Sequence, residues 1–470
     1  MAFKSRVKIT FLILFMGIKR RWKFFAGATF LILALSFLLL TVNPATIRSN
    51  SLSEGLIGTY QENDLPEIAT NLMSEGLVKM DKEGRAVSNL AVGWETNNDA
   101  TEFKFKLKPN LTWVDNTPIH SEDLAFSIPD VEITYPDSAT IKFKLKESFS
   151  AFPSLLSRPI FKKDSLIGTG PYRVIKVEKS LIFITKITLK PKDRSFPELV
   201  LRFYPNEKTA LSAFSLGEVQ SLLGVSSLEE FKSNPRAKTT AKLNYSRVVS
   251  ILYNFEDPIL GKSNRSIRQA LSYGAPVFKE EVAAKTSIPP TSWAFRGDVN
   301  DYLGNFEAAK QALGRARASM REEDLQKQIT LTVTPQLAGI GGEIASAWEG
   351  LGLKTVVRIE SGIPQNFQAL LITQTIPIDP DQYSLWHSTQ TKTNLTKYSS
   401  ARVDKDLEDG RKIVSEDMRK EKYYDFQRAL LEDSPATFLY FPRYNIVYLK
   451  KAEGKIEKVL PLQLNFSNPN

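Results

Sequence analysis

The stretch TEFKFKLKPNLTWVDNTPIHSEDLAFSI, residues 101–128, decides how the chain is interpreted. Its first eight residues alternate apolar and basic side chains, which is the period-two pattern of a strand with one buried and one exposed face. Its second half holds His120, one of only two histidines in the chain, followed by Ser121, Glu122 and Asp123. Acids that follow a capping residue and precede an apolar run face the positive end of a helix dipole. The stretch therefore predicts a strand and then the start of a helix.

The neighbourhood of His120 does not point to catalysis or metal binding. The other histidine, His387, lies outside any HExxH motif, and the chain has no cysteine to act as metal ligand, nucleophile or disulfide partner. The GKS at residues 261–263 ends like a phosphate-binding loop, but Glu256 occupies the place of that loop's first glycine. Acids are plentiful, so a glycosidase-like carboxylate pair stays open, although no pair stands out. We expect a protein that is not an enzyme and uses no cofactor or metal.

The positive charge of the chain is concentrated at its beginning. The formal net charge is +10, and residues 1–23 hold seven basic side chains and no acid, which leaves +10 − 7 = +3 for the rest. A high isoelectric point that comes largely from a tail is weak support for nucleic-acid binding. We therefore expect no nucleic-acid partner.

An uncharged stretch follows, FFAGATFLILALSFLLLTV at residues 24–42. At about 1.5 Å per residue a helix of this length spans roughly 28 Å, close to the thickness of a bilayer core. The cluster KRRWK before it places that side in the cytoplasm. We expect residues 1–23 to form a basic cytoplasmic tail, 24–43 a single transmembrane anchor and 44–64 a tether to an extracytoplasmic part. A cleaved signal peptide is the alternative.

The remaining pattern is that of an α/β protein. A second alternating strand is predicted at residues 140–146, and further strands at 181–190 and 198–205. In the second half, strand-like runs at 329–334, 354–360, 367–373 and 436–441 are interspersed with helical patterns at 264–275, 306–320, 341–352, 404–415 and 419–431. This interspersion of strands and helices indicates an α/β lobe.

Two loops carry the residues of a possible ligand pocket. IDPDQYSLWHS, residues 378–388, places two acids around a proline beside Tyr383 and Trp386, and SIPPTSWAF, residues 287–295, presents Trp293 on a rigid loop. An aromatic wall with a few fixed polar groups suits a ligand pocket. A surface turn with buried aromatic side chains is the alternative for both loops.

Six stretches, in chain order, resemble the family 5 extracellular solute-binding proteins, which are the dipeptide- and oligopeptide-binding receptors of ABC importers. They are residues 71–128, GTGPYRV at 168–174, RSIRQALSYGAP at 265–276, IPPTSWAF at 288–295, DPDQYSLWHS at 379–388 and KYYDFQRALLEDSPATFLYFP at 422–442. The chain departs from the family's opening motif at Asn116, His120 and Ser121. It also has Ile376 where peptide binders of the family often carry an amine-binding aspartate.

The resemblance implies a two-lobed α/β fold of the periplasmic-binding-protein type (type II), with hinge strands near residues 248–255 and 436–445 and a reduced third subdomain. Lobe I would comprise residues 65–248 and continue in 436–470, and lobe II would comprise 249–435. It also implies a ligand cleft between the lobes. The residues expected there are Tyr253, Asn254, Trp293, Asp379, Asp381, Tyr383 and Trp386.

The function implied by the resemblance is that of a membrane-anchored, extracytoplasmic substrate-binding protein of a bacterial ABC importer. It would capture a peptide or a related small solute and deliver it to permease subunits, and we expect it to be a monomer. A sensor or adhesive ectodomain on the same fold is one alternative. An extracellular hydrolase is another.

Overall fold

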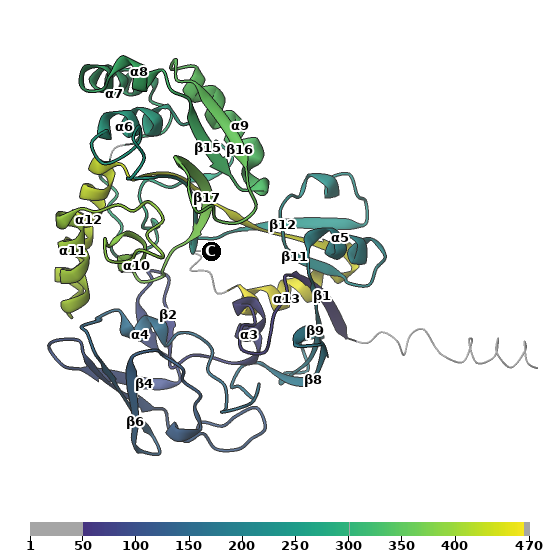
Figure 1. Ribbon diagram of the computed structural model, residues 1–470. Helices are drawn as coiled ribbons and strands as arrows, with labels where there is room; N and C mark the ends of the chain where they lie inside the picture. The colour runs from purple at the N-terminus through teal and green to yellow at the C-terminus, as the bar shows by residue number, and fades with distance from the viewer. Residues whose placement is uncertain (1–49, 300, 465–470) are drawn as a thin grey trace, which may run out of the picture. The chain divides into compact units, whose positions relative to one another are not determined.

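The structure, a computed structural model, describes residues 50–299 and 301–464 (Figure 1). The expected cytoplasmic tail and transmembrane anchor lie outside these residues. Within the described ranges, no helix has both the length and the apolar character needed to span a bilayer. The chain divides into one unit of Met1–Ser51 and a second of Leu52–Asn470, and the second unit contains the fold described below.

The first large sheet has seven strands and forms the centre of lobe I. Its order is β12 (Ala237–Leu243), β19 (Arg443–Leu449), β11 (Ser221–Val225), β1 (Ser51–Ile57), β10 (Glu198–Tyr204), β9 (Phe183–Pro191) and β8 (Tyr172–Ser180). Helices α3 (Glu67–Met73) and α13 (Glu453–Gln463) contribute to one core of this sheet, and α5 (Glu207–Ser215) contributes to another. Residues 51–57, expected from the sequence to lie in a tether, thus form a central strand.

A four-stranded sheet is inserted into lobe I, in the chain between the hairpin β2 (Val78–Met80)–β3 (Ala86–Ser88) and β8. Its strand order is β4 (Ala91–Thr96), β5 (Glu102–Leu107), β7 (Thr140–Leu145) and β6 (Val131–Asp137). The predicted alternation of β5 is confirmed, because Phe103, Phe105 and Leu107 are buried while Lys104 and Lys106 are exposed. The short helix α4 (Phe152–Leu155) packs its first residue, Phe152, against Phe103 and Phe143.

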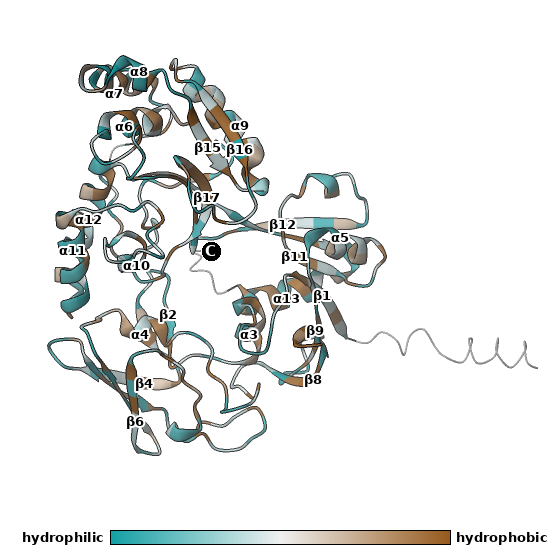
Figure 2. Ribbon diagram, in the orientation of Figure 1, coloured by the Kyte–Doolittle hydropathy of each residue, from teal (hydrophilic) through white to brown (hydrophobic). Residues whose placement is uncertain are grey.

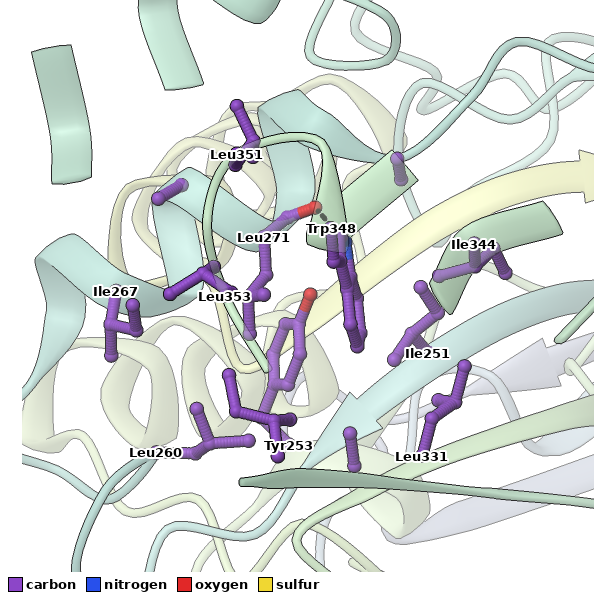
Figure 3. Close-up of a cluster of buried hydrophobic side chains, with 14 of the residues drawn as sticks. Ile251, Tyr253, Leu260, Ile267, Leu271, Leu331, Ile344, Trp348, Leu351 and Leu353 are labelled. Atoms are coloured by element: carbon purple, nitrogen blue, oxygen red, sulfur yellow. Dashed lines mark hydrogen bonds between the residues drawn. The ribbon is translucent and has the colours of Figure 1, made fainter. Parts of the chain in front are cut away.

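The second large sheet has six strands and forms the centre of lobe II. Its order is β14 (Val282–Ala283), β18 (Ala436–Phe441), β13 (Arg247–Tyr253), β17 (Ala369–Thr375), β15 (Ile329–Val333) and β16 (Thr355–Ile359). The helices α6 (Arg265–Gly274), α7 (Phe306–Ser319) and α9 (Ala338–Glu349) cover one core. There the Trp348 indole N–H donates to the Leu271 carbonyl at 2.9 Å beside Tyr253 (Figure 3).

The other core of lobe II lies under α11 (Ala401–Lys412) and α12 (Glu416–Asp433). Figure 2 shows β17 as strongly hydrophobic and α11 as largely hydrophilic, as expected for a buried strand and a surface helix. The five helices predicted in this half of the chain are all present, with ends displaced by at most three residues. Helix α9 begins earlier than predicted and contains Gly341, where a Cβ would lie 2.7 Å from Val333, so the glycine allows the helix to approach β15 closely.

The helix start predicted at His120 is confirmed as a single turn only. Residues Ser121–Asp123 form a 3₁₀ turn in which the Asp123 carboxylate accepts the His120 backbone N–H at 3.0 Å. Ser121 is buried, and its hydroxyl donates to the Asp137 carbonyl at 2.6 Å. At Leu124 the backbone becomes extended and bridges to Lys162. The turn is therefore fastened to the four-stranded sheet and does not continue as an α-helix.

The chain crosses between the large sheets at two adjacent places, after β12 and after β18. The Asn244 N–H donates to the Pro442 carbonyl at 2.9 Å, which joins the two crossings. The Asn244 side chain accepts from the N–H and the hydroxyl of Ser246 at 3.0 and 2.6 Å. The second crossing lies within the predicted hinge range 436–445, and the first precedes the predicted range 248–255 by a few residues.

Candidate functional site

A cavity of about 230 Å³ lies between the lobes and is called the interlobe cavity here. Lobe I contributes Arg85, Ala86, Val87, Trp94, Thr96, Ala100, Phe103, Ser150, Ala151, Pro153 and Ser154, and lobe II contributes Trp293, Asp379, Val414, Glu416 and Arg419. In Figure 1, α4 and β2 lie beneath α10 (Tyr383–Trp386) and α11. Three larger hollows elsewhere on the described surface contain none of the predicted site residues.

The two aspartates of the 378–388 loop are buried and ion-paired. Asp379 Oδ1 accepts from Arg419 Nη2 at 2.7 Å and from the Asp381 N–H at 2.9 Å. Asp381 accepts from the Tyr383 N–H at 3.0 Å and from Arg411 Nε at 2.9 Å. Burial raises the pKa of the Asp381 carboxyl, although the Arg411 charge opposes this rise. Each acid therefore fixes the loop backbone with one bond and neutralises an arginine with another.

Arg411 connects the two lobes. Its guanidinium lies 3.9 Å from the ring centre of Tyr383 and 4.7 Å from that of Phe149, so it is held between an aromatic ring of each lobe. The Arg411 carbonyl accepts from the Ser150 N–H at 2.8 Å, and the Gly410 carbonyl accepts from the Ser150 hydroxyl at 2.9 Å. These contacts of Phe149 and Ser150 with Gly410 and Arg411 are called the closure contacts below.

Arg419 forms the polar part of the lobe II wall. Its guanidinium lies 5.2 Å from the Trp293 ring, and its Nε donates to the Gly410 carbonyl at 3.2 Å. Its Nη2 also donates to the Tyr423 hydroxyl at 3.0 Å. Burial alone would lower the pKa of Arg419, but the neighbouring Asp379 and Tyr423 raise it overall, so the side chain stays charged.

The structure places the predicted site residues at three depths. Trp293 and Asp379 line the interlobe cavity, and Asp381 and Tyr383 lie behind it, in contact with Arg411. The other three lie in the interior or beside a loop of lobe II, and their polar groups bond to the protein. Tyr253 shares a 2.7 Å hydrogen bond with Thr437, Asn254 donates to the Phe367 carbonyl at 2.9 Å, and Trp386 donates to the Gln382 side chain at 2.9 Å.

Sequence reasoning missed the arginines of this site, Arg411 and Arg419, because no local motif surrounds them. One signal was present: Arg419 shares the spacing of Tyr423, Phe426 and Leu430, which places it on the buried face of α12. Among residues 50–299 and 301–464, no three His, Asp or Glu side chains are grouped so that they could hold a metal ion.

The model of the bacterial extracellular solute-binding proteins, family 5, middle region, matches residues 85–395, well over half of the chain. The chain belongs to this family. As a family 5 protein it is a solute-binding protein with the two-lobed fold described above, and its family is an extracellular one.

Curated family 5 relatives are distant but span most of the chain. The oligopeptide-binding protein AppA of Bacillus subtilis is 22% identical over 482 residues, covering 84% of this chain and 85% of AppA. The glutathione-binding protein GsiB of Pectobacterium atrosepticum is 22% identical over 522 residues, covering 93% and 96%. Among solved structures, NikZ from Campylobacter jejuni in complex with Ni(L-His) is 21% identical and covers 86% of this chain and 94% of NikZ, with a TM-score of 0.67. These similarities establish the fold.

Proposed function

We propose that this protein is the substrate-binding component of a bacterial ABC importer, held at the outer face of the cytoplasmic membrane by residues 24–43. It captures a peptide or a related small solute in the interlobe cavity and delivers it to permease subunits. The observation that carries this proposal is the composition of the cavity wall. Aromatic side chains, Trp293 from one lobe and Trp94 and Phe103 from the other, surround a few fixed polar groups, as in small-molecule sites.

The predicted site residues take graded roles in this proposal. Trp293 and Asp379 contact the solute, while Asp381 and Tyr383 hold Arg411 in place for lobe closure. Tyr253, Asn254 and Trp386 shape lobe II from behind. The names of AppA and GsiB, which bind an oligopeptide and glutathione, support a peptide-like ligand, whereas Ni(L-His) in NikZ indicates that the fold also accepts other solutes.

The proposal includes no catalytic step. A hydrolase needs a carboxylate free to exchange a proton or attack the substrate. The two carboxylates that line the cavity, Asp379 and Glu416, are each ion-paired, with Arg419 at 2.7 Å and with Arg85 at 2.9 Å. This arrangement supports binding without turnover.

Native mass spectrometry of the full chain in mild detergent, followed by denaturation, identifies what the protein carries. We expect a series of short peptides. A single non-peptide mass would keep the binding function and change the solute. A protein that is empty, and that peptides and sugars do not stabilise thermally, would contradict the importer proposal and favour a sensor or adhesive domain.

Calorimetry with the identified ligand then tests the site. Replacing Trp293 with Ala should weaken binding about tenfold or more, because a buried aromatic contact is lost. The control is Phe306→Ala, which removes a partly exposed aromatic side chain from α7. Equal affinities for the two variants would remove Trp293 from the site.

A further inference from the structure

The charged groups of the interlobe cavity compensate one another. Four charged side chains line it, two cations and two anions, and each is paired with another of the four. Arg419 pairs with Asp379 at 2.7 Å, and Arg85 Nε lies 2.9 and 3.0 Å from the two carboxylate oxygens of Glu416. Among the described residues the wall therefore has no net charge and no unpaired carboxylate.

A charged end group of a ligand would have to compete with these pairs. An ammonium group at Asp379 would lie beside Arg419, which cannot turn away to solvent because Gly410 and Tyr423 also hold it. A ligand carboxylate at Arg419 would lie beside Asp379 for the same reason. Like charges brought together in a partly desolvated site repel each other strongly, so neither kind of end group gains a favourable site.

The same ion pair still offers polar atoms to a neutral group. Arg419 Nη1 has no hydrogen-bond acceptor, and Asp379 Oδ2 no donor, among the described residues. Arg419 thus presents N–H donors, and Asp379 presents a carboxylate acceptor. Together these groups complement the C=O and the N–H of an amide. Trp293 lies beside them as an apolar surface. The volume of about 230 Å³ is smaller than that of most drug-sized pockets.

We infer that the interlobe cavity recognises internal amide groups of a short peptide, and not its charged amino or carboxyl terminus. The inference rests on the proposed function and refines it. The protein should bind peptides whose ends are blocked as well as it binds peptides whose ends are free.

The test is a competition between two tripeptide libraries of the same random composition. One library has free termini, the other is N-acetylated and C-amidated, and both are offered at equal concentration to the full chain. Native mass spectrometry reads the ratio of bound blocked to bound free peptide. We expect the two to differ by less than about threefold. An enrichment of free peptides above about tenfold would overturn the inference and leave the proposed peptide-binding function standing. If neither library binds, both this inference and the proposed peptide-binding function are overturned.

Two matched variants make the test specific to the charge balance. Arg85→Gln leaves Glu416 without its partner. Glu416→Gln removes the partner of Arg85 in the cavity wall and leaves it only Glu83, at 3.5 Å. Both side chains are partly exposed, so the fold should tolerate either change. Arg85→Gln should shift selection toward peptides with a free amine, and Glu416→Gln toward peptides with a free carboxylate, each by about threefold. Selection ratios unchanged in both variants would contradict the role of the compensated pairs.

Discussion

Arg268 shows how one buried side chain fastens distant segments of lobe II. Its guanidinium, with the residue only 1% exposed, donates to the carbonyls of Leu260, Gly261, Asp433 and Ser434 and lies 4.2 Å from the Phe255 ring centre. Burial lowers the pKa of Arg268 to about 10, so the side chain is charged at neutral pH. The start of α6 and the end of α12 are joined by this single group.

Replacing Arg268 with Met should lower the free energy of unfolding by about 3–5 kcal/mol, because it leaves several buried carbonyl groups without a donor. Urea denaturation followed by circular dichroism measures the change. Arg265→Met is the control, because Arg265 lies in the same helix but is exposed, and its replacement should change stability by less than about 0.5 kcal/mol. Similar losses in the two variants would show that the carbonyl contacts of Arg268 are not responsible.

Glu54 is a buried acid at the centre of lobe I. It lies in β1, accepts from the side-chain amide of Gln463 at the end of α13, and is 3.4 Å from the Ser221 hydroxyl. Burial raises the pKa of the Glu54 carboxyl from its ordinary 4.5 to about 7, and the two hydrogen bonds reduce this rise. Since the folded state holds the proton more tightly than the unfolded chain, Glu54 favours folding most at pH values below about 4.5.

This contribution should be lost as the pH rises from about 4.5 to 7, by roughly 3 kcal/mol in all. The variant Glu54→Gln keeps the shape of the side chain and cannot ionise. Its stability relative to the wild type should therefore increase between pH 5 and pH 8. Denaturant titrations at several pH values measure the difference, and a constant difference would show that Glu54 does not titrate in the folded protein.

At the scale of elements, the β8–β9 hairpin has an unusual turn. Ser180 pairs with Phe183, so Leu181 and Ile182 form a two-residue turn, and Leu181 has φ +55°. Such turns favour glycine at a first position with positive φ, because a side chain there is strained. Leu181 is also 92% exposed. Leu181 is therefore unfavourable both for the backbone conformation of this turn and for its exposure to solvent.

Leu181→Gly should raise the free energy of unfolding by about 0.5–1 kcal/mol, because relief of the left-handed strain exceeds the entropy added to the unfolded chain. The control is Ile182→Gly, at a position where φ is not positive, and it should lower stability by about the same amount. Thermal unfolding of both variants gives the comparison. Destabilisation by Leu181→Gly would indicate that the side chain makes a contact worth more than the strain.

The elements of this protein were easier to predict than its site. The alternation of β5 and the helical spacing of α12 record directly which side of each element faces the core, so the sequence predicted both. The single turn at Ser121 depends on hydrogen bonds to Asp137, the last residue of β6, and to Ser138 in the turn after it. The pairing of Asp379 with Arg419, and the burial of Trp386 away from the cavity, likewise depend on how separate segments pack. No local pattern encodes such packing.

At the scale of the whole fold, the closure contacts join the two lobes, and we expect them to couple ligand affinity to the approach of the lobes. Phe149 stacks on Arg411, and Ser150 donates to two carbonyl groups at the end of α11. A ligand that binds only the closed arrangement is bound more weakly when that arrangement is less populated. Phe149, which does not line the interlobe cavity, should therefore still tune the affinity for the solute.

Phe149→Ala should weaken ligand binding about fivefold, because loss of the cation–π contact costs about 1 kcal/mol of closure. It should also speed amide hydrogen exchange in residues 147–152, where the Ser150 N–H is bonded across the lobes. Calorimetry and exchange mass spectrometry measure the two effects, with Phe306→Ala as the control. Weakened binding without faster exchange would place Phe149 in the ligand site and not in closure.

The way Ser150 holds lobe II has a consequence for how the protein can change over evolution. Both of its acceptors are main-chain carbonyls, of Gly410 and Arg411, so these two hydrogen bonds do not depend on the side chains that α11 presents. Gly410 itself is constrained, because a Cβ there would lie 3.0 Å from the Tyr423 ring. We therefore expect that substitutions at other positions of the cavity wall can alter the preferred solute while the bonds from Ser150 to these carbonyls are retained. A change of solute would not require a change in the closure contacts.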